Sequence, residues 1–139
     1  MTNRRAEAAA RIAALRDAAR QAPGDFTARY ALAEAVYEDG DLEDAIIELR
    51  EAARLNPQDP DSRMWIGQIL FAWGDLAAAI ESLLESVRLE PDHGPARYLL
   101  GRVYGMVPDA AGVETQAREL DRLGKREWAA AIRGLLTGS

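Results

Sequence analysis

The chain repeats itself with a period of 34 residues, and this feature constrains its fold more than any other. The segment GDLEDAIIELREAARLNP runs from Gly40 to Pro57, and GDLAAAIESLLESVRLEP runs from Gly74 to Pro91. The same spacing brings Pro23 into line with the two later prolines. A repeat of this length is one supersecondary unit that buries its apolar face only by stacking on its neighbours. The sequence therefore predicts a chain of stacked units.

Each unit has the apolar spacing of helices. Ala45, Leu49 and Ala52 follow an i, i+4, i+7 pattern, and the stretch before Gly40 has a helical pattern of its own. Gly40 suits a left-handed turn between the two helices, and Asp41 can cap the second one. The unit is therefore predicted to be a helical hairpin, in a chain whose Ala and Leu content favours helix over sheet.

An acidic residue followed three positions later by arginine recurs through almost the whole chain. Residues three apart are neighbours on a helix surface, so each pair is expected to form a weak ion pair. The four pairs are Asp17 and Arg20, Glu51 and Arg54, Glu85 and Arg88, and Glu119 and Arg122.

Composition excludes several classes of function. The chain has no cysteine and one histidine, so disulfides are excluded and a histidine-based metal site is not expected. We predict that His93 is a solvated loop residue, and we expect no cofactor. A net charge of -6 argues against binding to nucleic acid. No apolar run approaches the roughly 18 residues of a membrane helix, and no signal peptide is evident, so we expect a cytoplasmic protein without membrane insertion.

At these positions the chain resembles the tetratricopeptide repeat family. That family keeps three small residues in each unit, where two helices cross closely. The first full unit has Ala33, Ala45 and Ala52 at these positions, and the second has Gly67, Ala79 and Ser86. The resemblance implies an all-α fold, a right-handed α-solenoid of stacked helix-turn-helix hairpins with about eight helices and capping helices at its ends.

The resemblance also divides the chain, which is expected to form a single domain over residues 1–139. Residues 4–22 form an N-terminal half repeat, residues 26–59 and 60–93 the two full repeats, and residues 94–124 a degenerate third repeat whose second helix is expected from Asp109 to Leu123. A C-terminal capping helix is expected at residues 125–137. It carries Trp128, Ile132 and Leu135 on one face, and this face would cover the open apolar end.

In the family, the first helix of each unit lines a concave surface, and the resemblance places a set of aromatic, methionine and charged residues there. An extended peptide or an amphipathic helix docks into such a surface. The predicted partner-binding residues are Tyr30, Glu34, Tyr37, Glu38, Met64, Trp65, Gln68, Phe71, Tyr98, Arg102 and Met106. The alternative is that some of these side chains only pack between neighbouring first helices or beneath the terminal helices.

Some members of the family grip a C-terminal carboxylate with Lys, Asn and Arg. The corresponding residues here are Tyr30, Glu34, Trp65, Pro95 and Leu99. None of them can clamp a carboxylate, so the resemblance predicts a more apolar ligand.

The predicted function is a protein–protein interaction module or scaffold. The alternative is a self-assembling structural repeat protein that forms homo-oligomers through its terminal helices. An enzyme is not expected, because no nucleophile has a base beside it in the predicted hairpins. Glu34 and Glu38 lie four residues apart on one helix, and such a surface pair is typical of solvated charge rather than a catalytic dyad.

Overall fold

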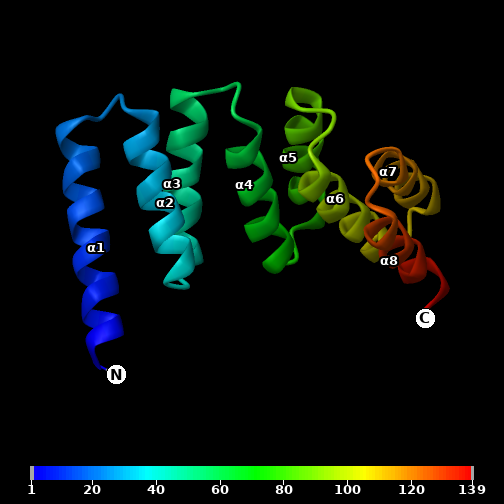
Figure 1. The fold of residues 1–139 in the computed structure, drawn as a ribbon, viewed down its shortest axis with the longest axis horizontal. Helices are drawn as coiled ribbons and strands as arrows, with labels where there is room; N and C mark the ends of the chain where they lie inside the picture. Colours follow the sequence, from blue (N-terminus) through cyan, green and yellow to red (C-terminus); the bar gives the residue numbers. More distant parts are fainter. Residues whose placement is uncertain (1, 139) are drawn as a thin grey trace. The chain divides into compact units, whose positions relative to one another are not determined.

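The computed structural model describes residues 2–138, and over this range the chain forms eight α-helices and no β-strand (Figure 1). The prediction of an all-α fold with about eight helices is confirmed. The helices are α1 (Thr2–Gln21), α2 (Phe26–Glu38), α3 (Leu42–Leu55), α4 (Pro60–Ala72), α5 (Leu76–Leu89), α6 (Gly94–Met106), α7 (Ala110–Arg122) and α8 (Arg126–Thr137).

Six of these helices begin at a residue whose side chain accepts a hydrogen bond from the backbone of the first turn. The capping residues are Asp25, Asp41, Asp59, Asp75, His93 and Asp109. Such a bond satisfies one of the N–H groups that a helix start leaves without an intrahelical partner. By contrast, α8 begins at Lys125, whose side chain makes no cap.

The turn that joins the two helices of a hairpin depends on a left-handed glycine. Gly40 has a φ of 88° and Gly74 a φ of 80°, as the sequence predicts. The amide of Asp41, the next residue, donates to the carbonyl of Val36 and so closes the turn. Gly124 repeats this geometry between α7 and α8, with a φ of 79°. A side chain at any of these glycines would strain the backbone.

The chain divides into two compact units between Gln58 and Asp59. The first unit contains α1, α2 and α3, in which α2 packs against both of the others. Its core includes Leu32, Val36 and Leu49. On the α1 side the contact depends mainly on Ala19, which is buried, while Ile12 is partly buried.

The second unit contains α4 to α8, in which each helix packs against the next. Ala79, Leu83 and Ser86 of α5 are completely buried. A Cβ atom on Gly67 would lie 2.6 Å from Cγ of Leu83, so α4 and α5 approach each other too closely for any larger residue. The small positions predicted from the repeat therefore lie at close helix crossings.

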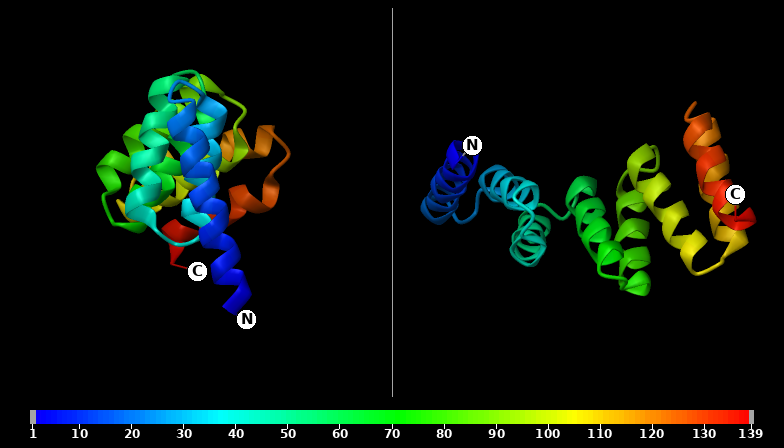
Figure 2. Two further views of the ribbon diagram at one scale, coloured as in Figure 1. Left: turned by 90° about the vertical axis from the view of Figure 1, so that its left-hand side faces the viewer. Right: turned by 90° about the horizontal axis from the view of Figure 1, so that it is seen from below.

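The last helix, α8, packs against both α6 and α7 (Figure 2). Ala129 and Ile132 are completely buried, and Ile132 fills the space above Gly101, where a Cβ atom would lie 2.4 Å from Cδ1 of Ile132. Leu135 lies over Gly105 but remains 48% exposed. Trp128 and Ile132 therefore pack as expected of a capping helix, and Leu135 is only partly covered.

The prediction of a solvated His93 is wrong. The side chain is only 8% exposed, and His93 occupies the position that Asp25 and Asp59 hold in the earlier repeats. Its Nδ1 atom accepts a hydrogen bond of 3.0 Å from the amide of Ala96. Its Nε2 atom lies 2.6 Å from Oδ1 of Asp61, so the ring joins the starts of α4 and α6. His93 is thus the N-terminal cap of α6.

Three of the four predicted acid–arginine pairs are present. Arg54, Arg88 and Arg122 each bind the glutamate three residues before them. These contacts hold the pKa of Glu51, Glu85 and Glu119 below the ordinary value, because the guanidinium hydrogen bond favours the charged carboxylate. In α1, Asp17 instead accepts a hydrogen bond from Gln21.

Candidate partner-binding surface

In the first unit, the predicted surface residues lie along α2. Tyr30 and Tyr37 are partly buried, whereas Glu34 and Glu38 are exposed. The ring of Tyr30 lies 5.6 Å from that of Phe26 between centroids, one helical turn earlier. The open part of α2 therefore carries both aromatic rings and carboxylates.

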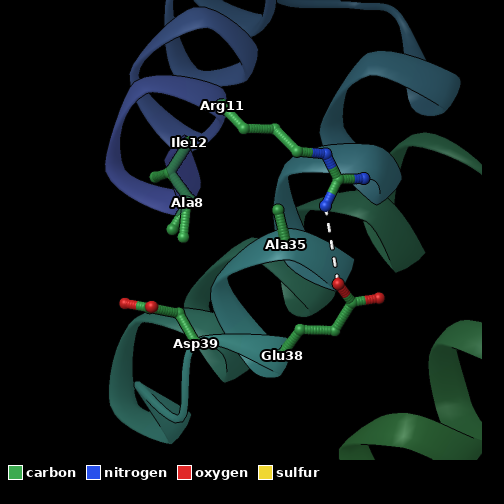
Figure 3. Close-up of a pocket in the computed structure, with 6 residues that line it drawn as sticks. All are labelled: Ala8, Arg11, Ile12, Ala35, Glu38 and Asp39. Atoms are coloured by element: carbon green, nitrogen blue, oxygen red, sulfur yellow. Dashed lines mark hydrogen bonds and ion pairs between the residues drawn. The ribbon is translucent and has the colours of Figure 1, made fainter. Parts of the chain in front are cut away.

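A hollow of about 220 Å³ lies between α1 and the end of α2 in this unit (Figure 3). Its lining includes Ala8, Ile12 and Ala35, and an ion pair of 3.4 Å between Arg11 and Glu38 stands at its edge. Glu38 is therefore already engaged by α1. Both side chains of the pair are more than half exposed, so the interaction is weak.

In the second unit, α4 contributes Trp65, Gln68 and Phe71, all of them partly buried. Their spacing places them on one side of the helix. Met64, which is predicted to belong to the same surface, is 7% exposed. Its side chain packs inside the fold, and we leave it out of the surface proposed below.

The same unit contains a row of aromatic rings and cations that extends over three helices. The guanidinium of Arg102 on α6 lies 5.2 Å from the ring centroid of Phe71 on α4 and 5.8 Å from that of Tyr98. The ring of Tyr98 lies 5.3 Å from that of Trp128 on α8, and Nζ of Lys125 lies 5.1 Å from the Trp128 ring. We call these five residues the cation–aromatic row: Phe71, Arg102, Tyr98, Trp128 and Lys125.

Two rings of the row, Tyr98 and Trp128, are supported by the hydrophobic core. Tyr98 and Trp128 pack against a cluster of completely buried residues from α7 and α8, formed by Val113, Ala117, Leu120, Ala129 and Ile132. Both rings are therefore partly covered by the core and partly open to solvent. Rings held in this way lose little conformational entropy when a ligand binds.

The two cations of the row differ from Arg122 and Arg133, which bind carboxylates. Arg122 binds Glu119 and Asp92, and Arg133 binds Glu114 and Asp121. Within residues 59–138, by contrast, neither Arg102 nor Lys125 has a carboxylate at ion-pairing distance, and both lie against aromatic rings. Their charge is therefore not compensated by the protein around them.

Beyond the row, the surface ends in an apolar edge at the C-terminal ends of α6 and α8. Met106 is 63% exposed and Leu135, on the neighbouring helix, 48%. Val107 and Leu136 are exposed beside them. Met106 belongs to the predicted set, and it is the most exposed large apolar residue of that surface.

The structure brings together only some of the predicted residues. Arg102 lies over both Phe71 and Tyr98, while Tyr30, Glu34, Tyr37 and Glu38 belong to the other unit. Sequence reasoning missed Lys125 and Trp128 as parts of the surface. The available signal was the helical spacing of Trp128, Ile132 and Leu135, which is also that of a first helix.

Two further classes of site find no support in the described part of the chain. No group of three or more His, Cys, Asp or Glu side chains within residues 2–138 is arranged to hold a metal ion. None of the eight described helices has both the length and the apolar character to cross a bilayer.

Known structures share this fold at low sequence identity. A tetratricopeptide repeat protein from Parabacteroides merdae ATCC 43184 aligns with a TM-score of 0.85 and 17% identity, over 95% of this chain and 53% of that one. A MamA structure aligns with a TM-score of 0.79 and 18% identity, over 98% and 79%. MamA from Desulfovibrio magneticus RS-1, from residue 41 to its end, aligns with a TM-score of 0.74 and 20% identity, over 97% of this chain and 86% of that one. At this identity the likeness shows the fold alone.

A comparison with curated proteins found no match in sequence. The model of one protein family, described as the tetratricopeptide repeat, matches residues 2–60 and 48–93. Together these segments cover well over half of the sequence, and they include the two repeated GDL segments on which the resemblance is based. The chain therefore belongs to the tetratricopeptide repeat family.

Proposed function

We propose that this protein binds a peptide or an amphipathic helix of a partner protein on the exposed faces of its first helices, α2 in the first unit and α4 and α6 in the second. Repeat proteins of this family are protein-interaction scaffolds and generally not enzymes, which supports the coarser part of the proposal. The observation that carries the finer part is that the aromatic side chains Tyr30, Trp65 and Tyr98 of the first helices are all partly open to solvent. Anchors for partner proteins are typically aromatic residues and arginine.

The test removes one aromatic side chain from each unit. The Trp65→Ala and Tyr30→Ala double variant is expected to lose partner capture in a pull-down, because each change removes a large contact area. Circular dichroism and thermal melting are expected to show that helicity is retained. A matched control is Trp73→Ala, since Trp73 is 48% exposed and follows the end of α4, outside the predicted set. Capture that persists in the double variant would place the partner elsewhere.

A second candidate is self-assembly through the terminal helices. It is favoured by the apolar edge of Met106, Val107, Leu135 and Leu136, which the second unit leaves exposed. Exposed apolar residues that lie together are typical of interaction sites. Light scattering over a concentration series distinguishes the two candidates. A monomer at every concentration contradicts self-assembly, and Leu135→Glu is expected to dissociate any oligomer that depends on this edge.

A further inference from the structure

We propose that the cation–aromatic row selects a partner segment in which carboxylate side chains flank an apolar stretch. This inference rests on the proposed function, since it specifies which peptide the surface of the second unit prefers. The surface is Phe71, Arg102, Tyr98, Trp128 and Lys125, all within residues 59–139.

The order of groups along the row determines the order of groups in the ligand. Arg102 lies over the ring of Tyr98, that ring lies tilted against the ring of Trp128, and Lys125 lies over the ring of Trp128. Each of the two adjacent rings thus has its own cation beside it. A complementary segment places apolar side chains on the rings and one carboxylate at each end, in the order acid, apolar, acid.

The charges of the row are available because the protein does not use them. Arg122 and Arg133 of the same unit show the contrast, because each of them binds two carboxylates. A ring face attracts a cation but carries no formal charge, so Arg102 and Lys125 keep a full positive charge beside partly exposed apolar surface. A carboxylate of the partner would supply the missing counter-charge, and Arg102 can bind it through two parallel hydrogen bonds.

Although the protein is acidic, an acidic ligand is expected to be attracted to the row, because Arg102 and Lys125 act at short range. The whole chain carries a net charge of -6, which repels an acidic ligand at long range. At physiological ionic strength charges are screened over about 8 Å, so the groups in direct contact dominate. One opposing group is Glu127, which lines the same hollow of about 340 Å³ as Lys125 and Trp128.

The experiment compares three synthetic peptides, each amidated at its C-terminus and carrying a fluorescent label. The first has Leu and Phe in the middle and two Glu at each end. The second has Gln in place of every Glu, and the third has the composition of the first with the four Glu in the middle. Fluorescence anisotropy with the full chain is expected to give the first peptide a Kd at least tenfold lower than the second and the third.

Variants of the chain test whether the row causes this preference. In the Arg102→Gln and Lys125→Gln double variant, the Kd of the first peptide is expected to rise to that of the second peptide. The Kd of the second peptide should differ little between the wild type and this variant. The control is the Arg20→Gln and Arg50→Gln double variant, which removes two exposed charges from α1 and α3. It should keep the preference. Glu127→Gln should strengthen binding of the first peptide, because it removes the opposing carboxylate.

Each outcome has a distinct meaning. Equal binding of the first and second peptides, or a preference that survives in the Arg102→Gln and Lys125→Gln variant, overturns the inference and leaves the proposed function standing. Failure of all three peptides to bind overturns both. A dimer that this double variant dissociates would show that a second copy of the chain occupies the row, and would also overturn the inference.

Discussion

Among single residues, His93 shows how one repeat position is filled by two kinds of side chain. Asp25 and Asp59 cap their helices with a carboxylate oxygen, whereas His93 uses a ring nitrogen. The imidazole accepts at Nδ1 from Ala96 and still has Nε2 for Asp61. One side chain therefore both caps α6 and connects it to the start of α4.

Removal of this cap should be measurable in the stability of the fold. His93→Ala is expected to lower the free energy of unfolding by about 1 kcal/mol, which is typical for the loss of a capping side chain. His93→Asn retains a capping oxygen and should lie closer to the wild type. Urea unfolding followed by circular dichroism measures both variants. Equal losses in the two would show that the ring contributes by packing and not by its hydrogen bond.

Arg63 shows the opposite case, a repeat position whose partner has been lost. Arg29 binds Glu48 and Arg97 binds Gln116, each at 3.0 Å and each 19 residues further on. The corresponding residue for Arg63 is Ser82, whose hydroxyl donates to the carbonyl of Arg63 and makes no hydrogen bond with its guanidinium. The buried Nε of Arg63, like that of Arg29, has no hydrogen-bond partner among the described residues. A buried polar group without a partner is costly.

A longer side chain at position 82 should offer the guanidinium of Arg63 the acceptor that Gln116 offers Arg97. Ser82→Gln is expected to raise the free energy of unfolding by about 0.5 to 1 kcal/mol, as a typical hydrogen bond does. Ser82→Leu is similar in size without an acceptor and serves as the control. Thermal melting compares the two variants. A stabilisation that Ser82→Leu shares would show that packing, and not Arg63, is responsible.

At the scale of helices, α8 differs from α2 to α7 because its N-cap residue makes no side-chain cap. Lys125 makes no side-chain cap, and its positive charge lies at the positive end of the helix dipole. Lys125→Asp is expected to be more stable than Lys125→Ala by about 1 kcal/mol, since both lose the contact with Trp128 and only the first gains a cap. Chemical denaturation of the two variants measures this difference. Equal stability would mean that the loop geometry does not permit a cap.

The crossing of α4 and α5 gives a prediction about packing between helices. Gly67→Leu is expected to lower the free energy of unfolding by about 1 to 3 kcal/mol, because the new side chain would overlap Leu83. Gly24→Ala is a matched control, as nothing lies within 4 Å of the added Cβ atom. Urea unfolding measures both. An unchanged Gly67→Leu variant would mean that the two helices separate at little cost.

For the whole molecule, the arginine contacts predict a dependence of stability on pH. Hydrogen bonds from arginine lower the pKa of Glu51, Glu85, Glu114 and Glu119 from an ordinary value of 4.5. A carboxyl whose pKa is lower in the folded state stabilises the fold above its unfolded pKa. That contribution is lost as the pH falls through the lowered values, so the melting temperature should decrease below about pH 4.5.

Arg133→Gln provides the control for this effect, because Arg133 holds the pKa of Glu114 down and also binds Asp121. The variant should be less stable than the wild type near neutral pH, and the difference between them should shrink in acid. A constant difference at every pH would contradict the electrostatic origin. Melting curves measured between about pH 6 and about pH 3 make the comparison.

The fold was largely predictable because its information is periodic. Helical spacing recurs in each unit, and the turn glycines Gly40 and Gly74 and most of the capping aspartates recur with it, so the prediction for one unit supports that for the next. The cation–aromatic row was only partly predictable, since Trp128 and Lys125 follow Gly124, where the 34-residue register is lost. The buried His93 was mispredicted because its partner Asp61 is 32 residues away, and loop position alone does not reveal such a contact.

The contacts of Trp128 with Tyr98 and Lys125 also have an optical consequence. Indole emission depends on the charge and the polarity around the ring, and Trp128 lies within the proposed site. Replacement of Trp65 and Trp73 by Phe leaves it as the sole indole of the chain. A shift of its emission maximum on adding a ligand would then report occupancy of this surface directly, without a label on either molecule.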